Sequence, residues 1–436
     1  MQINLTGKSV LLGVTGSISA YKACDLARLF IKAGADVHIV MTASAERFVS
    51  ALTFEALTRN AVLTENSESW SSDLNHIDMG KKCDVFVIAP ATANTLNKLS
   101  KGIADNILTQ TALAFKGEMI VAPAANTQML ANHYTTGSLK MLGVNDYIII
   151  PPQEKLLACG DIGNGALAEP NEIFFEVAKS LLKDPFWEDR RIVVTGGGTR
   201  EKIDEVRYIS NFSSGKMAKS LCLALYLKGA DVCYITTMGN EGLPSGIYTI
   251  DAEDAEEIFD YTKDAIRVSK KGKMSKPSMN ASDRHLIQKE PYLFMVAAIA
   301  DFTPKFPQEG KLKKSMLGET WNIELKQTTD ILSSLDKTDI KTVAFKAEMD
   351  SQEGLNNAVN LLREKDVDAV CYNLLQDATS FGGNENEITF ITKDTQVKLG
   401  RADKLTLSNK ILHEAKKLST NENFNSHTTP KETDIT

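Results

Sequence analysis

V-V-T-G-G-G-T-R-E-K-I-D-E-V-R-Y-I-S-N-F-S-S-G-K-M-A-K, the stretch from Val193 to Lys219, decides the fold of the second half of the chain. An apolar, β-branched run ends in consecutive glycines, and a second turn opens the following helix. Glycine lets a backbone approach a phosphate that a Cβ would hold away, and the amides of a helix start, with a lysine nearby, supply donors and positive charge. The pattern predicts a polyphosphate cradle made of Gly196, Gly197, Ser213, Gly215 and Lys216.

Consecutive glycines also occur at ordinary strand-to-helix corners, so the glycines alone do not separate a corner from a nucleotide site. Their polar neighbours favour one interpretation. Asn211 lies between the two turns, and Arg200 and Arg207 stand beside them. Because folding alone would not require such a cluster, the nucleotide site is favoured.

Length and composition set limits on the class of protein. A chain of 436 residues exceeds what one hydrophobic core usually supports, so two domains are expected. The 43% apolar fraction excludes a mostly disordered chain, and no apolar run is long enough to cross a bilayer. No secretory leader precedes the first predicted strand, and a cytoplasmic location is expected. The formal charge of -7 offers no general attraction to nucleic acid or to a membrane, so neither is an expected partner.

The six cysteines are scattered and form no C-x-x-C pair. This spacing argues against a disulfide framework and against a zinc site, and it is typical of a reducing compartment. Cys24, Cys222, Cys233 and Cys371 fall in apolar helices or strands, where cysteine packs as a small apolar residue.

Short apolar runs alternate with helical-period segments, the pattern of parallel sheets with crossover helices. Strands are expected at residues 10–14, 37–41, 85–89, 119–122 and 147–150, and again at 192–195, 232–236, 293–297, 342–346 and 369–373. A hairpin, 388–391 with 396–399, and a helix at 403–417 complete the second half. The predicted fold class is α/β, with two doubly wound, mainly parallel three-layer sheets, flavodoxin-like in the N-terminal half and Rossmann-like in the C-terminal half.

The predicted domains are residues 1–184 and 190–418, joined by a linker at 185–189. Residues 419–436 are polar and are expected to be a disordered tail. The basic, polar stretch 270–290 is expected to be a surface insertion.

The first predicted strand ends in G-V-T-G-S-I-S, residues 13–19, where an open α/β sheet binds a phosphate. The spacing is not G-x-G-x-x-G, and hydroxyl groups in place of the third glycine suit a monophosphate better than a pyrophosphate. FMN is therefore favoured over NAD. A simple capped helix start, with Ser17 or Ser19 as the N-cap, would explain the same residues.

Three later segments place polar residues after apolar strands, where doubly wound proteins build their sites. They are residues 89–94, continued to 104–106, residues 122–127, and the glycine-rich stretch 158–165, which is expected to be a mobile loop. With the first turn and Thr42, which follows the predicted strand 37–41, they predict a flavin site made of Gly16, Ser17, Thr42, Pro90, Thr92, Asn94, Ala104, Asp105 and Asn106.

His76 and Cys159 are the candidate proton-transfer groups. His76 stands in N-H-I-D before a predicted helix, and Cys159 is the one cysteine of the glycine-rich stretch. A lone histidine is more often a surface or capping residue. Beside a flavin-like pocket, His76 becomes the candidate base and Cys159 the candidate acid.

Nearly the whole chain resembles the bacterial family in which a phosphopantothenoylcysteine decarboxylase is fused to a phosphopantothenate-cysteine ligase, the bifunctional coenzyme A biosynthesis proteins. The first half is similar to flavin-containing cysteine decarboxylases through G-V-T-G-S-I-S-A-Y-K, N-H-I-D, A-P-A-T-A-N-T, G-I-A-D-N, P-A-A-N-T and A-C-G-D-I-G-N-G. The second half resembles the ligases through the stretch quoted first, A-A-I-A-D-F at 297–302 and K-L-K-K at 311–314.

For the first half, the resemblance implies decarboxylation to 4'-phosphopantetheine. FMN would oxidise the cysteinyl thiol to a thioaldehyde, which permits loss of carbon dioxide before the hydride returns. His76 would assist the proton and hydride step, Asn126 would hold the substrate carboxylate, and Cys159 would protonate the intermediate.

The chain departs from the family pattern at Ala125, Leu130 and Ala166, where methionine, tryptophan and arginine are usual. Because His76, Asn126 and Cys159 are retained, an active decarboxylase is predicted, and the departures predict weaker substrate binding. Three rival functions stay open. A nicotinamide oxidoreductase should carry an acidic residue about 20 positions past a G-x-G-x-x-G turn, and neither turn supplies it cleanly. The others are a non-catalytic regulatory relative, similar to the yeast halotolerance proteins, and a ligase whose flavin half is only a scaffold.

For the second half, the resemblance implies that 4'-phosphopantothenate and L-cysteine are joined through an acyl-cytidylate made from CTP, with Mg²⁺ bound to the triphosphate. Asn211 would contact the acyl-cytidylate, Lys311 the leaving phosphates, and Asp301 the nucleotide and the metal. The other implied nucleotide contacts are Ala297, Thr329, Asp330, Ile331, Leu332, Phe345 and Lys365. The alternatives are a solvated basic loop for Lys311, Lys313 and Lys314, and a strand-end cap for Asp301.

The implied partners are small molecules, namely 4'-phosphopantothenate, L-cysteine, CTP and phosphopantothenoylcysteine. The resemblance also implies a homo-oligomer, with a trimeric flavin half and a dimeric ligase half combined in a dodecamer.

Overall fold

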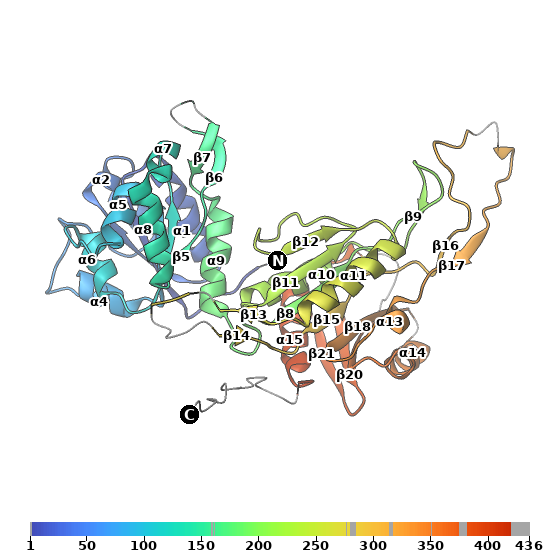
Figure 1. Ribbon diagram of the computed structural model, residues 1–436. Helices are drawn as coiled ribbons and strands as arrows, with labels where there is room; N and C mark the ends of the chain where they lie inside the picture. The colour runs from blue at the N-terminus through green and yellow to red at the C-terminus, as the bar shows by residue number, and fades with distance from the viewer. Residues whose placement is uncertain are drawn as a thin grey trace, which may run out of the picture. The chain divides into compact units, whose positions relative to one another are not determined.

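The computed structural model describes residues 2–157, 160, 162–275, 277–279, 285–313, 317–349, 351–374 and 382–419 (Figure 1). The chain forms two compact units, Gln2–Lys183 with Ser275–His285, and Asp184–Met274 with the chain from Leu286 onward. All but the first residue of the expected disordered tail lies outside the described residues. No helix of the described ranges is both long and apolar enough to span a membrane.

The N-terminal unit is built on a five-stranded sheet in the order β2-β1-β3-β4-β5. Every neighbouring pair is parallel. This order is that of flavodoxin-like proteins, and the predicted fold class is confirmed for this half. The strands are β1 (Ser9–Val14), β2 (Asp36–Met41), β3 (Val85–Ala91), β4 (Glu118–Pro123) and β5 (Ile148–Ile149).

Helices cover both faces of this sheet. Phe30 and Phe174, on the helices α1 and α9, pack with ring centroids 5.5 Å apart. A separate core cluster joins Leu11, Phe86 and Val121 of the sheet to residues of α4, α5, α6 and α8. The helices are η1 (Ile18–Tyr21), α1 (Lys22–Lys32), α2 (Ala43–Glu46), α3 (Ala51–Thr58), α4 (His76–Lys82), α5 (Ala93–Leu99), α6 (Ile107–Ala114), α7 (Thr127–Ala131), α8 (His133–Val144) and α9 (Pro170–Leu182).

Residues 162–165 of the glycine-rich stretch belong to a strand, so the predicted mobile loop was wrong for them, while residues 158, 159 and 161 lie outside the described residues. β7 (Ile162–Ala166) pairs antiparallel with β6 (Gln153–Leu156), and the two form an arm beside α7 (Figure 1). A Cβ on Gly163 would lie 2.2 Å from Thr127 Oγ1, and one on Gly165 would lie 2.2 Å from the carbonyl oxygen of Ala125. These glycines therefore allow close packing of the arm on the loop after β4.

The C-terminal unit is built on an eight-stranded sheet in the order β12-β11-β8-β15-β18-β19-β20-β21. Its first three strands in the chain lie in reverse order at one side, as in Rossmann-like sheets, which confirms the predicted class. The strands are β8 (Arg191–Gly196), β11 (Asp231–Thr236), β12 (Tyr248–Asp251), β15 (Tyr292–Met295), β18 (Lys341–Glu348), β19 (Ala369–Leu374), β20 (Glu385–Thr392) and β21 (Gln396–Asp403). β20 and β21 are the predicted hairpin and run antiparallel.

The remaining elements of this unit are helices and short two-stranded pairs. The helices are α10 (Lys216–Leu227), α11 (Ala255–Ser269), α13 (Ile331–Ser334), α14 (Ser351–Glu364) and α15 (Lys404–Lys416). The pairs are β9 (Glu201–Lys202) with β10 (Tyr208–Ile209), β13 (Lys273–Met274) with β14 (Leu286–Ile287), and β16 (Phe302–Pro304) with β17 (Leu325–Gln327).

Residues 184–190 carry an aromatic cluster of the C-terminal unit. Trp187 is 1% exposed, and its ring centroid lies 5.1 Å from that of Tyr292 and 4.8 Å from that of Phe186. The guanidinium of Arg190 lies 3.9 Å from the Phe186 ring centroid. Burial lowers the pKa of Arg190 from its usual value. These aromatic rings therefore pack at one edge of the hydrophobic core of the C-terminal unit.

Truncation of Trp187 tests this packing. Trp187→Ala is expected to lower the free energy of unfolding of the C-terminal unit by about 3–5 kcal/mol, because a fully buried ring is replaced by a cavity. Denaturant unfolding of the full chain measures the change. Tyr248→Ala, whose side chain is 67% exposed in the same unit, is the control and should stay within about 0.5 kcal/mol. A loss equal to that of the control would contradict a core role for the cluster.

Candidate functional site

A cavity of about 930 Å³ opens at the carboxyl edge of the N-terminal sheet. The loops after β1, β2, β3 and β4 line it, together with residues of the β6–β7 arm. Its size is at the upper end of cavities that hold small ligands and cofactors. Of the predicted flavin-site residues, it is lined by Gly16, Ser17, Thr42, Thr92, Asn94 and Asn106, and the predicted carboxylate-binding Asn126 lines it as well.

Hydrogen bonds tie these loops together. Thr15 Oγ1 donates to the carbonyl oxygen of Pro90 at 2.7 Å and accepts from the amide of Thr92 at 3.1 Å. Ser17 caps η1 by accepting from the amide of Ser19, so the capping interpretation of this turn also holds. A Cβ on Gly16 would lie 2.5 Å from Ser44 Cβ, which explains the glycine there.

Pro90, Ala104 and Asp105 do not line the cavity. Asp105 accepts hydrogen bonds from Lys98 Nζ at 2.7 and 2.8 Å, and this partner lowers the pKa of its carboxyl group. Lys98 itself lines the cavity, as does Asn106, which caps α6. Asp105 therefore contributes to the wall by orienting Lys98.

Two lysines of the cavity wall were missed by sequence reasoning. Lys22 Nζ lies 3.3 Å from Glu169 Oε1, and Lys155 Nζ bonds to the same oxygen. The hydrogen bond from Lys155 lowers the pKa of Glu169. The sequence holds no spacing signal for this cluster, since its members come from three separate segments. The two lysines place positive charge at the cavity, where Ala166 stands in place of the arginine that is usual in the family.

The family departures fall at this site. Ala125 and Ala166 line the cavity, while Leu130 is 7% exposed and belongs to the core cluster. Asn126 caps α7 by accepting from the amide of Gln128 at 2.9 Å. The loop that carries Asn126 is held by the hydrogen bond from the amide of Ala125 to the carbonyl oxygen of Gly165, at 3.2 Å.

His76 is the first residue of α4 and does not line this cavity. Its Nδ1 lies 2.7 Å from Glu68 Oε1, and its ring meets the Trp70 ring edge-on with centroids 5.5 Å apart. A carboxylate on one ring nitrogen favours the proton there and leaves Nε2 as the basic nitrogen. Sequence reasoning missed Glu68, which is eight residues away in a loop. Cys159 lies outside the described residues.

In the C-terminal unit, close packing surrounds the glycine turn. A Cβ on Gly196 would lie 2.5 Å from Ala218 Cβ. A Cβ on Gly197, where φ is +90°, would lie 2.2 Å from Thr237 Oγ1. A Cβ on Gly198 would lie 2.7 Å from the carbonyl oxygen of Asn211. Close packing alone therefore explains these glycines, as expected at an ordinary strand-to-helix corner. Because glycine has no side chain, the turn can also lie directly against the segment that carries Asn211.

The turn is bonded to the segment after β15. The amide of Ala298 donates to the carbonyl oxygen of Gly197 at 2.8 Å, and the amide of Ala300 donates to Thr199 Oγ1 at 3.0 Å. Asn211 Nδ2 donates to the carbonyl oxygen of Ile299 at 2.8 Å. The structure thus brings the predicted residues Gly197, Asn211, Ala297 and Asp301 to one edge of the sheet.

The next turn continues this edge. The amide of Thr328 donates to the carbonyl oxygen of Asp301 at 3.0 Å, so Thr329 and Asp330 follow directly. Asp330 caps α13 and forms an ion pair with Lys365. Two other predicted residues, Ile331 and Leu332, pack in the core cluster of this unit, and Phe345 is half-buried on β18.

Lys311 and Lys216 differ in their surroundings. Lys311 is exposed, and its loop is held by Arg207, which donates to the carbonyl oxygen of Leu312 at 2.6 Å, and by Asp204, which accepts from the Leu312 amide at 3.2 Å. Lys216 Nζ donates to the Gly382 carbonyl oxygen at 2.8 Å and to Asn384 Oδ1 at 3.0 Å.

The helix α10 begins at Lys216 after Gly215, where φ is +66° and no side chain caps the helix. Gly215 instead donates its own amide to Ser213 Oγ, at 3.4 Å. Lys314 lies outside the described residues. Within the described ranges, no three His, Cys, Asp or Glu side chains form a metal-binding group, Asp301 included.

Comparison with known proteins agrees with this division. Residues 2–182 match the Flavoprotein family, and residues 187–272 and 266–418 match the DNA/pantothenate metabolism flavoprotein C-terminal domain. The coenzyme A biosynthesis bifunctional protein CoaBC of Bacillus subtilis (strain 168) is 35% identical over 95% of this chain and 98% of its own length. The protein of that name from Mycobacterium bovis (strain ATCC BAA-935 / AF2122/97) is 32% identical over 93% of this chain and 95% of its own.

Solved structures are similar to each half. A mutant PPC decarboxylase complexed with pantothenoylaminoethenethiol is 37% identical, has a TM-score of 0.36, and aligns 39% of this chain with 96% of its own. The C-terminal domain of a coenzyme A biosynthesis bifunctional protein CoaBC is 24% identical, has a TM-score of 0.40, and aligns 54% of this chain with 98% of its own.

Proposed function

The chain belongs to the family of coenzyme A biosynthesis bifunctional proteins, with a flavoprotein decarboxylase domain and a ligase domain, and from this premise we propose which residues perform each reaction. Its activities are those of a lyase and a ligase acting on small molecules. The N-terminal reaction is loss of carbon dioxide from phosphopantothenoylcysteine. The C-terminal reaction joins 4'-phosphopantothenate to cysteine.

For the lyase half, FMN is the proposed cofactor. The assignment rests on the cavity at the carboxyl edge of the N-terminal sheet, which Asn126 lines. The wall offers Ser17, Thr42 and Thr92 hydroxyl groups and the backbone at Gly16, groups that fit a phosphate ester and a polar ring system. Bound there, FMN supplies a reversible hydride acceptor. Asn126 Nδ2 would bind the substrate carboxylate, and Lys22 and Lys155 would attract its phosphate. His76 does not line the cavity, and its role as the group whose Nε2 accepts a proton is proposed from the family motif. Cys159 is proposed as the acid from the family motif.

Glu68 is proposed as a positioning residue for His76. Glu68→Gln is expected to lower the decarboxylation rate by about tenfold or more, because the neutral amide no longer fixes the proton on His76 Nδ1. Flavin content and ligation should stay unchanged, and the pH profile of decarboxylation should shift. Glu68→Asp should restore part of the rate. Glu46→Gln, a residue that does not line the cavity, is the control. An unchanged rate and pH profile would remove Glu68 from the mechanism.

For the ligase half, CTP is the proposed activating nucleotide and Mg²⁺ its counter-ion. The edge formed by Gly197, Asn211 and Ala297 would hold the acyl-cytidylate, and Lys311 would neutralise the leaving pyrophosphate. Asp301 would reach the metal from the same edge. Because no metal cluster of three acidic or imidazole groups occurs in the described ranges, the triphosphate oxygens would supply most of the ligands.

One preparation tests both assignments. The purified protein should be yellow with an FMN spectrum, and with 4'-phosphopantothenate, L-cysteine, CTP and Mg²⁺ it should release CMP, pyrophosphate and carbon dioxide. Release of CMP without carbon dioxide would instead favour a ligase with a flavin-binding scaffold. A colourless protein that does not consume CTP would contradict both assignments.

A further inference from the structure

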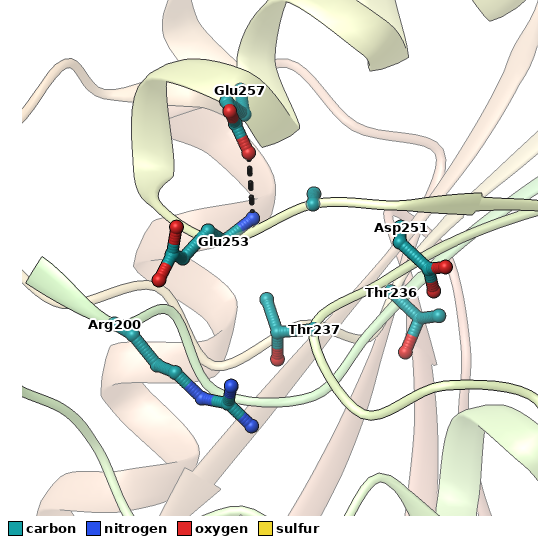
Figure 2. A pocket seen from close by; sticks show the side chains of 7 residues that line it. Arg200, Thr236, Thr237, Asp251, Glu253 and Glu257 are labelled. Carbon is teal, nitrogen blue, oxygen red and sulfur yellow. Dashed lines mark hydrogen bonds between the residues drawn. The ribbon is translucent and has the colours of Figure 1, made fainter.

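A second cavity, of about 390 Å³, lies beside the glycine turn of the C-terminal unit (Figure 2). It opens at the carboxyl ends of β11 and β12 and is lined by Arg200, Thr236, Thr237, Asp251, Ala252, Glu253 and Glu257. Its volume is at the lower end of small-ligand cavities. Apart from Arg200, whose position beside the turn favoured a nucleotide site, no residue implied for the nucleotide or the flavin lines it.

Two charged side chains of the cavity, the guanidinium of Arg200 and the carboxylate of Asp251, are not paired with other side chains in the described ranges. The backbone amide of Arg200 donates to the Glu253 carbonyl oxygen at 2.8 Å, which fixes the residue in place. Its guanidinium lies 5.7 Å from the Tyr208 ring centroid and makes no hydrogen bond or ion pair within the described ranges. The carboxylate of Asp251 likewise has no such partner among the described residues.

The other two carboxylates are already engaged. Glu253 pairs with Lys202 at 2.6 Å, and Glu257 accepts from the Glu253 amide at 2.7 Å (Figure 2). Thr237 Oγ1 donates to the Gly198 carbonyl oxygen at 2.7 Å, and Thr236 Oγ1 accepts from the Met238 amide at 3.0 Å. These bonds connect the segments that form the wall between Arg200 and Asp251.

A ligand that carries both charges would match the chemistry of these two side chains. Three carboxylates around the cavity would repel a polyphosphate, and a simple cation would leave the guanidinium of Arg200 without a partner. A free α-amino acid has a carboxylate for the Arg200 fork and an ammonium group for Asp251. The threonine hydroxyls between them can accept from the ammonium group.

We propose that this cavity binds the amino-acid substrate of the ligase half, with Arg200 on the α-carboxylate and Asp251 on the α-ammonium group. The inference rests on the ligase function proposed above. Only the glycine turn separates this cavity from the Asn211 segment, because a Cβ on Gly197 would meet Thr237 and one on Gly198 would meet Asn211. The bound amino acid would thus lie next to the activated acyl group that its amine attacks.

Kinetics of the full-length chain test the proposal. Arg200→Gln and Asp251→Asn should each raise the KM for L-cysteine by about tenfold or more, the effect of removing a hydrogen-bonded charge. Exchange of pyrophosphate into CTP, driven by 4'-phosphopantothenate without cysteine, should stay within about twofold of the unmodified enzyme. Arg200→Gln should also lose the preference for L-cysteine over 2-aminoethanethiol, which lacks the carboxylate. Arg200→Lys, a milder change, should show an intermediate KM.

Controls come from the same unit. Arg267→Gln and Asp264→Asn change an exposed ion pair on α11, 3.0 Å long, and should alter neither reaction. An unchanged cysteine KM in the Arg200 and Asp251 variants would overturn the proposal, and so would an equal fall in pyrophosphate exchange, which would assign the cavity to the nucleotide. If the unmodified enzyme releases no CMP when L-cysteine is also present, the ligase assignment itself fails.

Discussion

Asn211→Asp is expected to stop cysteine-dependent release of CMP, with a rate at least about 100-fold below that of the unmodified enzyme. The side chain keeps its size, but the Nδ2 group that donates to the Ile299 carbonyl oxygen at 2.8 Å is replaced by an oxygen. Two oxygens then face each other, and a negative charge stands where the acyl-cytidylate phosphate is proposed to bind. The loss is measured as CMP released from CTP, 4'-phosphopantothenate and L-cysteine.

Decarboxylation by the N-terminal unit of the same variant serves as the internal control. Decarboxylation of supplied phosphopantothenoylcysteine should be unchanged, because all the residues that line the proposed flavin cavity belong to the other unit. Asn240→Asp, an exposed residue of the C-terminal unit whose amide group lies 3.4 Å from Thr249 Oγ1, is the matched control. Full CMP release by Asn211→Asp would show that the edge formed by Gly197 and Asn211 is not the reacting site.

The reciprocal change is Asn126→Asp, which should lower decarboxylation by at least about 100-fold while the protein stays yellow. Aspartate is as good an N-cap as asparagine, so α7 keeps the cap that now accepts from the Gln128 amide at 2.9 Å. The new charge instead repels the substrate carboxylate. Carbon dioxide release from phosphopantothenoylcysteine measures the loss.

Asn132→Asp is the matched control for this change. Asn132 caps the next helix, α8, by accepting from the Tyr134 amide at 3.0 Å, yet it does not line the flavin cavity. It should decarboxylate normally, and ligation should be normal in both variants. If Asn126→Asp retains its rate, or loses flavin together with activity, the carboxylate-binding role of Asn126 is wrong.

The sequence predicted both sheets because their central strands are fully buried. Val10–Val14 and the run before the glycine turn are continuous apolar segments, which only a sheet covered on both faces requires. It did not predict β12, whose residues Tyr248–Asp251 are exposed or half-buried and carry no such run. The short pairs β9–β10, β13–β14 and β16–β17 were missed for the same reason.

The site was predicted where its residues are contiguous in sequence and missed where they are not. The loop residues Gly16 and Ser17 do line a cavity, since a strand end delivers them to the sheet edge. Glu68 beside His76, and Glu169 beside Lys155, are tertiary contacts that no local pattern encodes. The glycine-rich stretch shows the limit most clearly, because glycine density cannot distinguish freedom of the backbone from the need for close contact.

The close seating of the β6–β7 arm makes it a mechanical partner of the loop it touches. There is no room for even one methyl group at Gly163 or Gly165, so the arm lies in direct contact with Thr127 and Ala125. Because the Ala125 amide also donates to the Gly165 carbonyl oxygen, the arm directly contacts the residue that precedes Asn126, the side chain proposed to bind the substrate carboxylate.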